Sequence, residues 1–206
     1  FNNPRSGSAR LRLLRCLGRV TAGVQFVESE WERVYSRLGE KQLLPTSYLI
    51  GQTKAITDLN EFLCGEDRII HVRSDFSSSD SKAFLLAFFV HNKEHSPSVV
   101  IVESKDVLDY LIDMGFSEVI IVDPNLKLTG ETFYRCNSSN AKILLPIYSI
   151  TDLKKAIQLN RLHNTSYVEL LQNIGFSEED SMRYSNMTNG SLTCLRCFIN
   201  DSFPVS

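Results

Sequence analysis

The feature that most constrains the fold is the stretch from Arg68 to Val90, which reads RIIHVRSDFSSSDSKAFLLAFFV. It opens with a short apolar run, Ile69 to Val72, which predicts a buried strand, and it passes through a polar loop, residues 74–81. It closes in an apolar segment, residues 82–90, which has the length of a helix. A strand, a short polar loop and a helix in this order form a segment whose backbone N–H groups and helix N-terminus face an anion.

The following residues repeat the alternation of strand and helix. Apolar runs at 99–102, 119–122 and 143–147 predict three further strands, and the first of these is followed by an amphipathic helix that ends at Gly115. Residues 125–139 are polar and contain a glycine, so we expect a loop there. Strands that alternate with helices predict an α/β fold, with a parallel sheet sandwiched by helices.

Helical patterns lie on both sides of this region. Upstream, apolar residues recur at helical spacing over residues 26–38, with Gly39 as the expected end, and again over residues 55–63 before Gly65. Downstream, helical patterns cover four segments: 153–162, 167–174, 178–187 and 192–199. Ser177 and Ser191 are the expected N-caps of the last two helices.

These patterns predict three parts of the chain. Residues 1–25 are expected to be a flexible basic arm, residues 26–150 an α/β domain, and residues 151–206 a small all-helical lid domain. The chain begins at Phe1 and ends at Ser206, and we expect it to be a piece of a longer polypeptide.

Composition narrows the classes of partner. The net charge of −2 gives no support for nucleic-acid binding by the chain as a whole. Only the arm, with five arginines and no acidic residue, would support it. Five scattered cysteines, an odd number, are not a disulfide framework, so we expect a reducing cytoplasmic location. The sequence has no apolar run of 18 residues, so we expect no membrane partner.

The polar loop can be aligned with the phosphate-binding motif G-x-x-x-x-G-K-[ST]. Ser74 and Ser79 then take the two glycine positions, Asp80 takes the lysine position, and only Ser81 keeps its residue type. Serine lacks the conformational freedom of glycine, and Asp80 puts an anion where a cation would bind phosphate. We therefore expect phosphate binding by this loop to be lost or to be rebuilt with other residues.

Three segments resemble the core of AAA+ and STAND P-loop ATPases, in the same order along the chain. They are LIGQTKAITDL (residues 49–59), which resembles the segment that packs on adenine; VIIVD (residues 119–123), which resembles Walker B; and GSLTCLR (residues 190–196), which resembles the sensor 2 helix. The resemblance covers about residues 26–200. It implies ATP or ADP with Mg²⁺ as the cofactor, Ser81 and Asp123 as metal ligands, and a set of cofactor-binding residues. That set is Ile50, Gly51, Ser79, Asp80, Ser81, Lys82 and Arg196.

The departures from the family pattern decide the expected function. Pro124 stands where the catalytic acid would follow Asp123, so we name no catalytic residue. We expect a degenerate module with weak or lost ATP hydrolysis, which acts as a regulatory or assembly domain of a larger protein. Its partners would be other domains, other proteins or further copies of the chain.

Two alternatives stay open. One is an active ATPase with a non-standard loop, in which Ser81 and Asp123 hold Mg²⁺ while Lys82 and Arg196 contact phosphates. The other is an α/β protein-interaction domain with no nucleotide.

Overall fold

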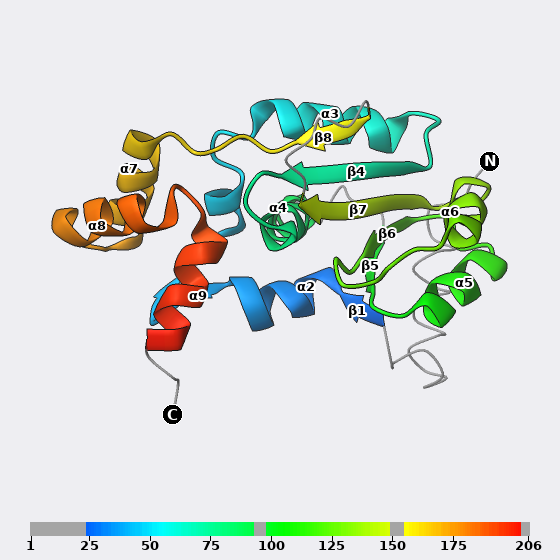
Figure 1. Ribbon diagram of the computed structural model, residues 1–206, viewed down its shortest axis with the longest axis horizontal. Helices are drawn as coiled ribbons and strands as arrows, with labels where there is room; N and C mark the ends of the chain where they lie inside the picture. Colours follow the sequence, from blue (N-terminus) through cyan, green and yellow to red (C-terminus); the bar gives the residue numbers. More distant parts are fainter. Residues whose placement is uncertain (1–23, 93–97, 149–154, 203–206) are drawn as a thin grey trace.

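The computed structural model describes residues 24–92, 98–148 and 155–202, so most of the predicted arm lies outside the described part (Figure 1). The elements follow in this order: β1 (Val24–Phe26), α2 (Val27–Glu30), the π-helical turn η1 (Trp31–Tyr35), β2 (Arg37–Leu38), β3 (Lys41–Gln42), the 3₁₀ turn η2 (Pro45–Tyr48), α3 (Thr53–Cys64), β4 (Ile69–Ser74), α4 (Ser78–His91), β5 (Val99–Val102), α5 (Lys105–Asp113), β6 (Val119–Val122), α6 (Gly130–Asn137), β7 (Lys142–Tyr148), β8 (Ala156–Gln158), α7 (Asn164–Ile174), α8 (Glu178–Thr188) and α9 (Leu192–Ser202).

Six strands form one sheet in the order β1-β5-β6-β7-β4-β8. All neighbours pair in parallel except β1, which runs antiparallel to β5 with Gln25 opposite Ile101. β4 lies between β7 and β8, with Val72 opposite Pro146 on one side and Ile157 on the other. The predicted α/β fold with a mostly parallel sheet is confirmed.

Helices cover both faces of the sheet, because successive strand residues point to opposite sides. On β6, Ile121 packs into a core cluster with residues of α2, η1, α3 and α4, whereas Ile120 packs into a second cluster with residues of α5 and α6. α4 is buried along most of its length, as expected for a helix that is apolar all round. The predicted layering of helices around a sheet is therefore present.

The last three helices build a separate hydrophobic core. Here we call α7, α8 and α9 the helical lid. Its core contains Tyr167, Leu171 and Leu195, and it also takes in Leu38 and Leu43 from the β2–β3 hairpin region. In Figure 1 the lid lies beyond the arrowheads of β4 and β7. The segment before α3 thus reaches across and holds the lid beside the carboxyl edge of the sheet.

Two predicted elements are wrong. Residues 125–139 are not one loop, because α6 forms within them, with the N–H of Thr132 donating to the cap residue Thr129 at 3.3 Å. The helical pattern over 153–162 is also wrong where the structure describes it, since Ala156–Gln158 is strand β8 at the edge of the sheet. Parallel pairing with β4 overrides the local spacing there, and residues 149–154 lie outside the described ranges.

Two further predictions need smaller corrections. The helix expected over 26–38 starts at Val27 and gives way to the π-helical turn η1, which ends at Tyr35, so Gly39 does not end it. Gly39 instead has φ +60° in the β2–β3 hairpin, a backbone conformation that favours glycine. The strand β1 was not expected, because three residues carry too little pattern.

A buried lysine stabilises the edge of the sheet at which the parallel strands β4 and β7 begin. Lys142 Nζ donates to the carbonyls of Phe62, Gly65 and Asp67 at 2.9, 2.6 and 2.7 Å. These carbonyls lie at and just after the C-terminal end of α3, where helix carbonyls have no partner within the helix. The ammonium therefore ties the end of α3 to the first residue of β7.

Candidate functional site

The candidate site lies at the carboxyl edge of the sheet. Because β4, β5, β6 and β7 are parallel, Ser74, Glu103, Asp123 and Tyr148 come together at or just after their last residues. Open α/β sheets bind ligands outside this edge. α4 also begins here, so the predicted site residues of α4 and β6 meet at one place.

The connection from β4 to α4 is a short turn, residues 75–77, rather than the longer loop predicted over 74–81. Residues 79–81 belong to the first turn of α4, and Ser77 Oγ caps the helix by accepting the N–H of Asp80 at 3.2 Å. A phosphate cradle needs a run of free backbone N–H groups. This turn is too short to wrap around a phosphate, and Ser77 already binds the N–H of Asp80.

Asp80, which stands at the lysine position of the motif, is bound by hydroxyl groups from the start of its own helix and from the start of α9. Ser77 Oγ donates to Oδ2 at 2.7 Å, while Ser191 Oγ and Thr193 Oγ1 donate to Oδ1 at 2.8 and 2.5 Å. Ser191 and Thr193 belong to the start of α9 and are both buried. The side chain that aligns with the lysine position of the motif thus binds the helical lid.

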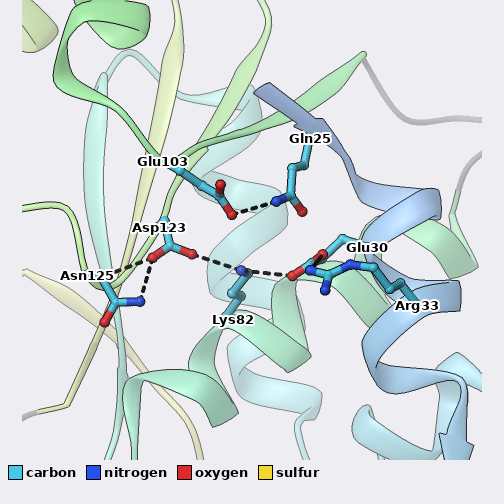
Figure 2. Close-up of polar contacts among 7 residues, drawn as sticks. All are labelled: Gln25, Glu30, Arg33, Lys82, Glu103, Asp123 and Asn125. Carbon is cyan, nitrogen blue, oxygen red and sulfur yellow. Dashed lines mark hydrogen bonds and ion pairs between the residues drawn. The ribbon is translucent and has the colours of Figure 1, made fainter. Parts of the chain in front are cut away.

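Lys82 lies two positions further along α4 and bridges two acids. Its Nζ lies 2.9 Å from Asp123 Oδ2 and 3.1 Å from Glu30 Oε1, and all three side chains are at least nine-tenths buried. Figure 2 shows the ammonium between the two carboxylates, with Arg33 on the far side of Glu30 and Asn125 on the far side of Asp123. The ammonium therefore takes the position beside Asp123 where the resemblance would put a metal ion.

The ionisation of this group follows from its contacts. Burial opposes the charge of Lys82, but the hydrogen bonds and negative charges of Asp123 and Glu30 outweigh it, so the pKa of Lys82 is raised. Burial also opposes the charge of Asp123, but hydrogen bonds from Lys82 and from the backbone and side chain of Asn125 lower its pKa. Lys82 and Asp123 therefore form a charged, internally paired couple at neutral pH.

The hydroxyl of Ser81 is already used within the protein. Its side chain is fully buried, and Oγ donates to the carbonyl of Ile147 at the end of β7 at 3.1 Å. Asp123 Oδ1 accepts the backbone N–H and the side-chain amide of Asn125 at 3.0 and 2.9 Å. The two predicted metal ligands therefore face different internal partners in this structure.

The segment around Ile50 and Gly51 meets the chain just before the lid. Gly51 has φ +74°, and the side chain of Gln52 both donates to the carbonyl of Asn160, at 2.8 Å, and accepts its N–H, at 2.9 Å. Ile50 is 40% exposed. The backbone groups of Asn160 that could recognise a flat polar ligand are thus paired with the Gln52 amide.

Arg196 lies apart from these residues. Its guanidinium stacks over the ring of Tyr35 at 5.1 Å, and within the described ranges its buried Nε has no hydrogen-bond partner. Tyr35 packs with Trp31 and Tyr48 in an aromatic group under the lid. Arg196 therefore lies against an aromatic cluster and is not in contact with Asp80.

The space left between these parts is small. A cavity of about 60 Å³ is lined by residues that include Ile50, Asp80, Arg161 and Ser191. Sites for drug-sized ligands and cofactors measure roughly 300–1,000 Å³. This cavity alone has no room for a nucleotide. Two more open hollows adjoin predicted site residues, one of about 250 Å³ beside Asp123 and one of about 390 Å³ beside Ile50.

Taken together, the geometry divides the predicted site residues into three groups. Lys82 and Asp123 meet directly, and Asp80 and Ser81 bind other partners. The third group takes part in neither set of contacts: Ile50, Gly51, the exposed Ser79 and the stacked Arg196. Sequence reasoning missed Glu30, although a signal was present. Glu30 lies three residues after Val27 on the apolar side of the predicted helix, where a buried acid needs a cationic partner.

Comparison with protein-family models and with curated proteins gave no match. Across residues 24–92, 98–148 and 155–202, no helix is long and apolar enough to cross a membrane. The same part of the chain contains no group of three or more histidine, cysteine or acidic residues placed to hold a metal ion.

Proposed function

We propose that this chain is a degenerate AAA+/STAND-like module that acts as a regulatory or assembly domain and does not hydrolyse ATP. The observation that carries the proposal is the Lys82 ammonium, which lies 2.9 Å from Asp123 in place of a metal ion. Phosphoryl transfer on such folds relies on Mg²⁺ and a phosphate-binding cation. Here the acid is neutralised from within, and Asp80 has replaced the cation.

Displacing Lys82 to admit Mg²⁺ would be costly. Glu30 is 3% exposed and its Oε1 accepts from Lys82. Moving the ammonium away therefore leaves a buried acid whose remaining ion-pair partner, among the described residues, is Arg33. Breaking one member out of a buried ion pair costs roughly 3–5 kcal/mol. That energy opposes metal binding at Asp123 before any contact with a nucleotide is made.

The position of the lid supports the same proposal. In a working ATPase of this kind, the nucleotide would fill the space between the sheet edge and the lid. Here Asp80, Ser191 and the paired Gln52 and Asn160 line a cavity of only about 60 Å³ between the lid and the sheet. The protein then acts through its surface, on other domains, other proteins or further copies of itself, in the cytoplasm.

Phosphate release from ATP in the presence of Mg²⁺ tests the proposal, with Asp123→Ala as the reference variant. We expect the wild-type protein to release no more phosphate than the variant. Turnover that is present in the wild-type protein and lost in Asp123→Ala would establish an active ATPase instead.

A nucleotide-free protein-interaction domain is the second candidate, and the small cavity favours it. The two candidates differ in their response to nucleotides in a thermal melt without Mg²⁺. A saturable shift with ATP or ADP supports a degenerate module with residual affinity. Melting curves that stay the same with every common nucleotide support the nucleotide-free domain.

A further inference from the structure

Two helices begin at the same point of the molecule. α4 starts at Ser78 on the sheet side, and α9 starts at Leu192 on the lid side. Each is preceded by a serine cap: Ser77 Oγ accepts the N–H of Asp80, and Ser191 Oγ accepts the N–H of Cys194 at 3.0 Å. The N-terminal ends of both helices carry partial positive charge, which favours an anion between them.

The carboxylate of Asp80 is the anion at this point. It receives one hydroxyl from its own helix, at 2.7 Å, and two from the start of α9, at 2.8 and 2.5 Å. Across the described ranges, no lysine or arginine forms an ion pair with it. Hydroxyl donors and helix ends hold the charge, as they would hold a bound oxyanion.

A second helix start in the same chain shows what the local sequence alone produces. At α8, Ser177 accepts the N–H of Asp180 at 3.1 Å and donates to Asp180 Oδ2 at 2.9 Å, which matches the contacts between Ser77 and Asp80. Asp180 is partly buried, as Asp80 is, and in the described part of the chain its hydrogen bonds with side chains go to Ser177 alone. The contacts of Asp80 with Ser191 and Thr193 therefore add to a local cap, and they join residues 111 and 113 positions apart.

We propose that Asp80 is an intramolecular latch. Its carboxylate occupies an oxyanion site shared by the first turns of α4 and α9, and this contact holds the helical lid closed against the sheet without a nucleotide. The site itself accepts small carboxylate or phosphate-like oxyanions once the Asp80 carboxylate is removed. The inference stands on the contacts of Asp80 and does not require that the chain descends from an ATPase.

The test removes the carboxylate and then supplies it from solution. In Asp80→Ala the Cβ stays, so formate is the probe that matches the missing group. We expect the variant to melt about 4–8 °C below the wild-type protein, given the loss of hydrogen bonds to a charged group. Sodium formate should restore part of that difference in a saturable way, with a midpoint on the order of 10 mM for so small a ligand, while sodium chloride at equal ionic strength should not.

Asp180→Ala is the matched control, because it removes the same Ser–Asp side-chain contact at a helix start without a second helix. It should lower the melting temperature by about 2 °C or less, and formate should have no saturable effect on it or on the wild-type protein. A similar loss in both variants, or a formate response that is the same in Asp80→Ala and in the wild-type protein, would overturn the latch.

A second measurement covers the case in which Asp80→Ala does not fold. Thr193→Val removes one lid-side donor while it keeps the shape of the side chain. Hydrogen exchange in the first turn of α9 should then become faster by roughly tenfold, since one hydrogen bond to a charge is lost, while exchange in α8 stays unchanged. Exchange in α9 at the wild-type rate contradicts the latch, and neither result depends on whether the protein binds ATP.

Discussion

Replacing Lys82 with methionine should destabilise the protein strongly at neutral pH. Methionine keeps much of the volume of the lysine stem but removes the charge, so two buried carboxylates lose their common partner. Removing one partner of a buried ion pair costs roughly 3–5 kcal/mol. Because Glu30 keeps Arg33 and Asp123 keeps Asn125, we expect the lower end, about 3 kcal/mol.

The loss of stability in Lys82→Met should depend on pH. In the wild-type protein the pKa of Asp123 is lowered, so its contribution to stability is present above its unfolded pKa and is lost as pH falls through the folded pKa. Without Lys82, burial acts with less opposition and raises the pKa of Asp123, so its ionised form lowers stability at neutral pH. Protonation relieves this, and the difference between variant and wild type should be largest near pH 7 and smaller near about pH 5.

Urea unfolding followed by circular dichroism at several pH values measures both effects. Lys54→Met is the matched control, because Lys54 pairs with Asp58 on the surface and is 74% exposed. Its loss should be about 0.5 kcal/mol or less at any of these pH values. If Lys82→Met costs no more than Lys54→Met, or if its cost does not change with pH, the ion-paired group at the sheet edge is not as described.

Three further predictions concern the fold around the site. Lys142→Met should lower the free energy of unfolding in urea by about 2–4 kcal/mol, because the carbonyls of Phe62, Gly65 and Asp67, at and just after the end of α3, lose their donor. A loss below about 1 kcal/mol would contradict this role. Gly190→Ala should lower the melting temperature by several degrees, because φ is +83° and a Cβ would lie 2.9 Å from a backbone oxygen. Gly130→Ala, in open space at the start of α6, should raise the melting temperature slightly. Equal shifts in the two variants would contradict the backbone conformation described for Gly190. Burial raises the pKa of the Cys136 thiol to about 11, whereas Cys64 is exposed. A thiol reagent at pH 8 should therefore modify Cys64 in the folded protein at least roughly tenfold faster than Cys136, as measured by peptide mass spectrometry. Equal rates would show that Cys136 is not buried.

Much of the sheet could be predicted from the sequence, because its central strands are continuous apolar runs. VVIV and VIIV became β5 and β6 with the expected bounds, and α4 is apolar all round as its sequence indicates. The shorter elements could not be found in this way. β8 has three residues whose neighbours imitate helical spacing, and its strand conformation comes from pairing with β4. α6 is short and polar, so the pattern of apolar residues did not reveal it. Its N-cap residue, Thr129, was a signal of the helix that this pattern does not include.

The site was predictable in its location but not in its contacts. The expected order of strand ends placed Lys82 and Asp123 at one edge, and they do meet there. The partners of Asp80 lie more than a hundred residues away, and no local pattern links an acid on α4 to hydroxyls on α9. Glu30 had a local signal as an acid on an apolar helix face, but its partner depends on how α2 packs against α4.

The central claim is that the protein's own side chains fill the place where a metal and a nucleotide would bind. Titration of Mn²⁺ with ATP, followed by the loss of the free Mn²⁺ signal in electron paramagnetic resonance, tests this claim most directly, with Asp123→Ala as the reference. We predict that the wild-type protein and the variant remove the same amount of free Mn²⁺ from solution. Binding of one Mn²⁺ per wild-type chain that disappears in Asp123→Ala would contradict the claim.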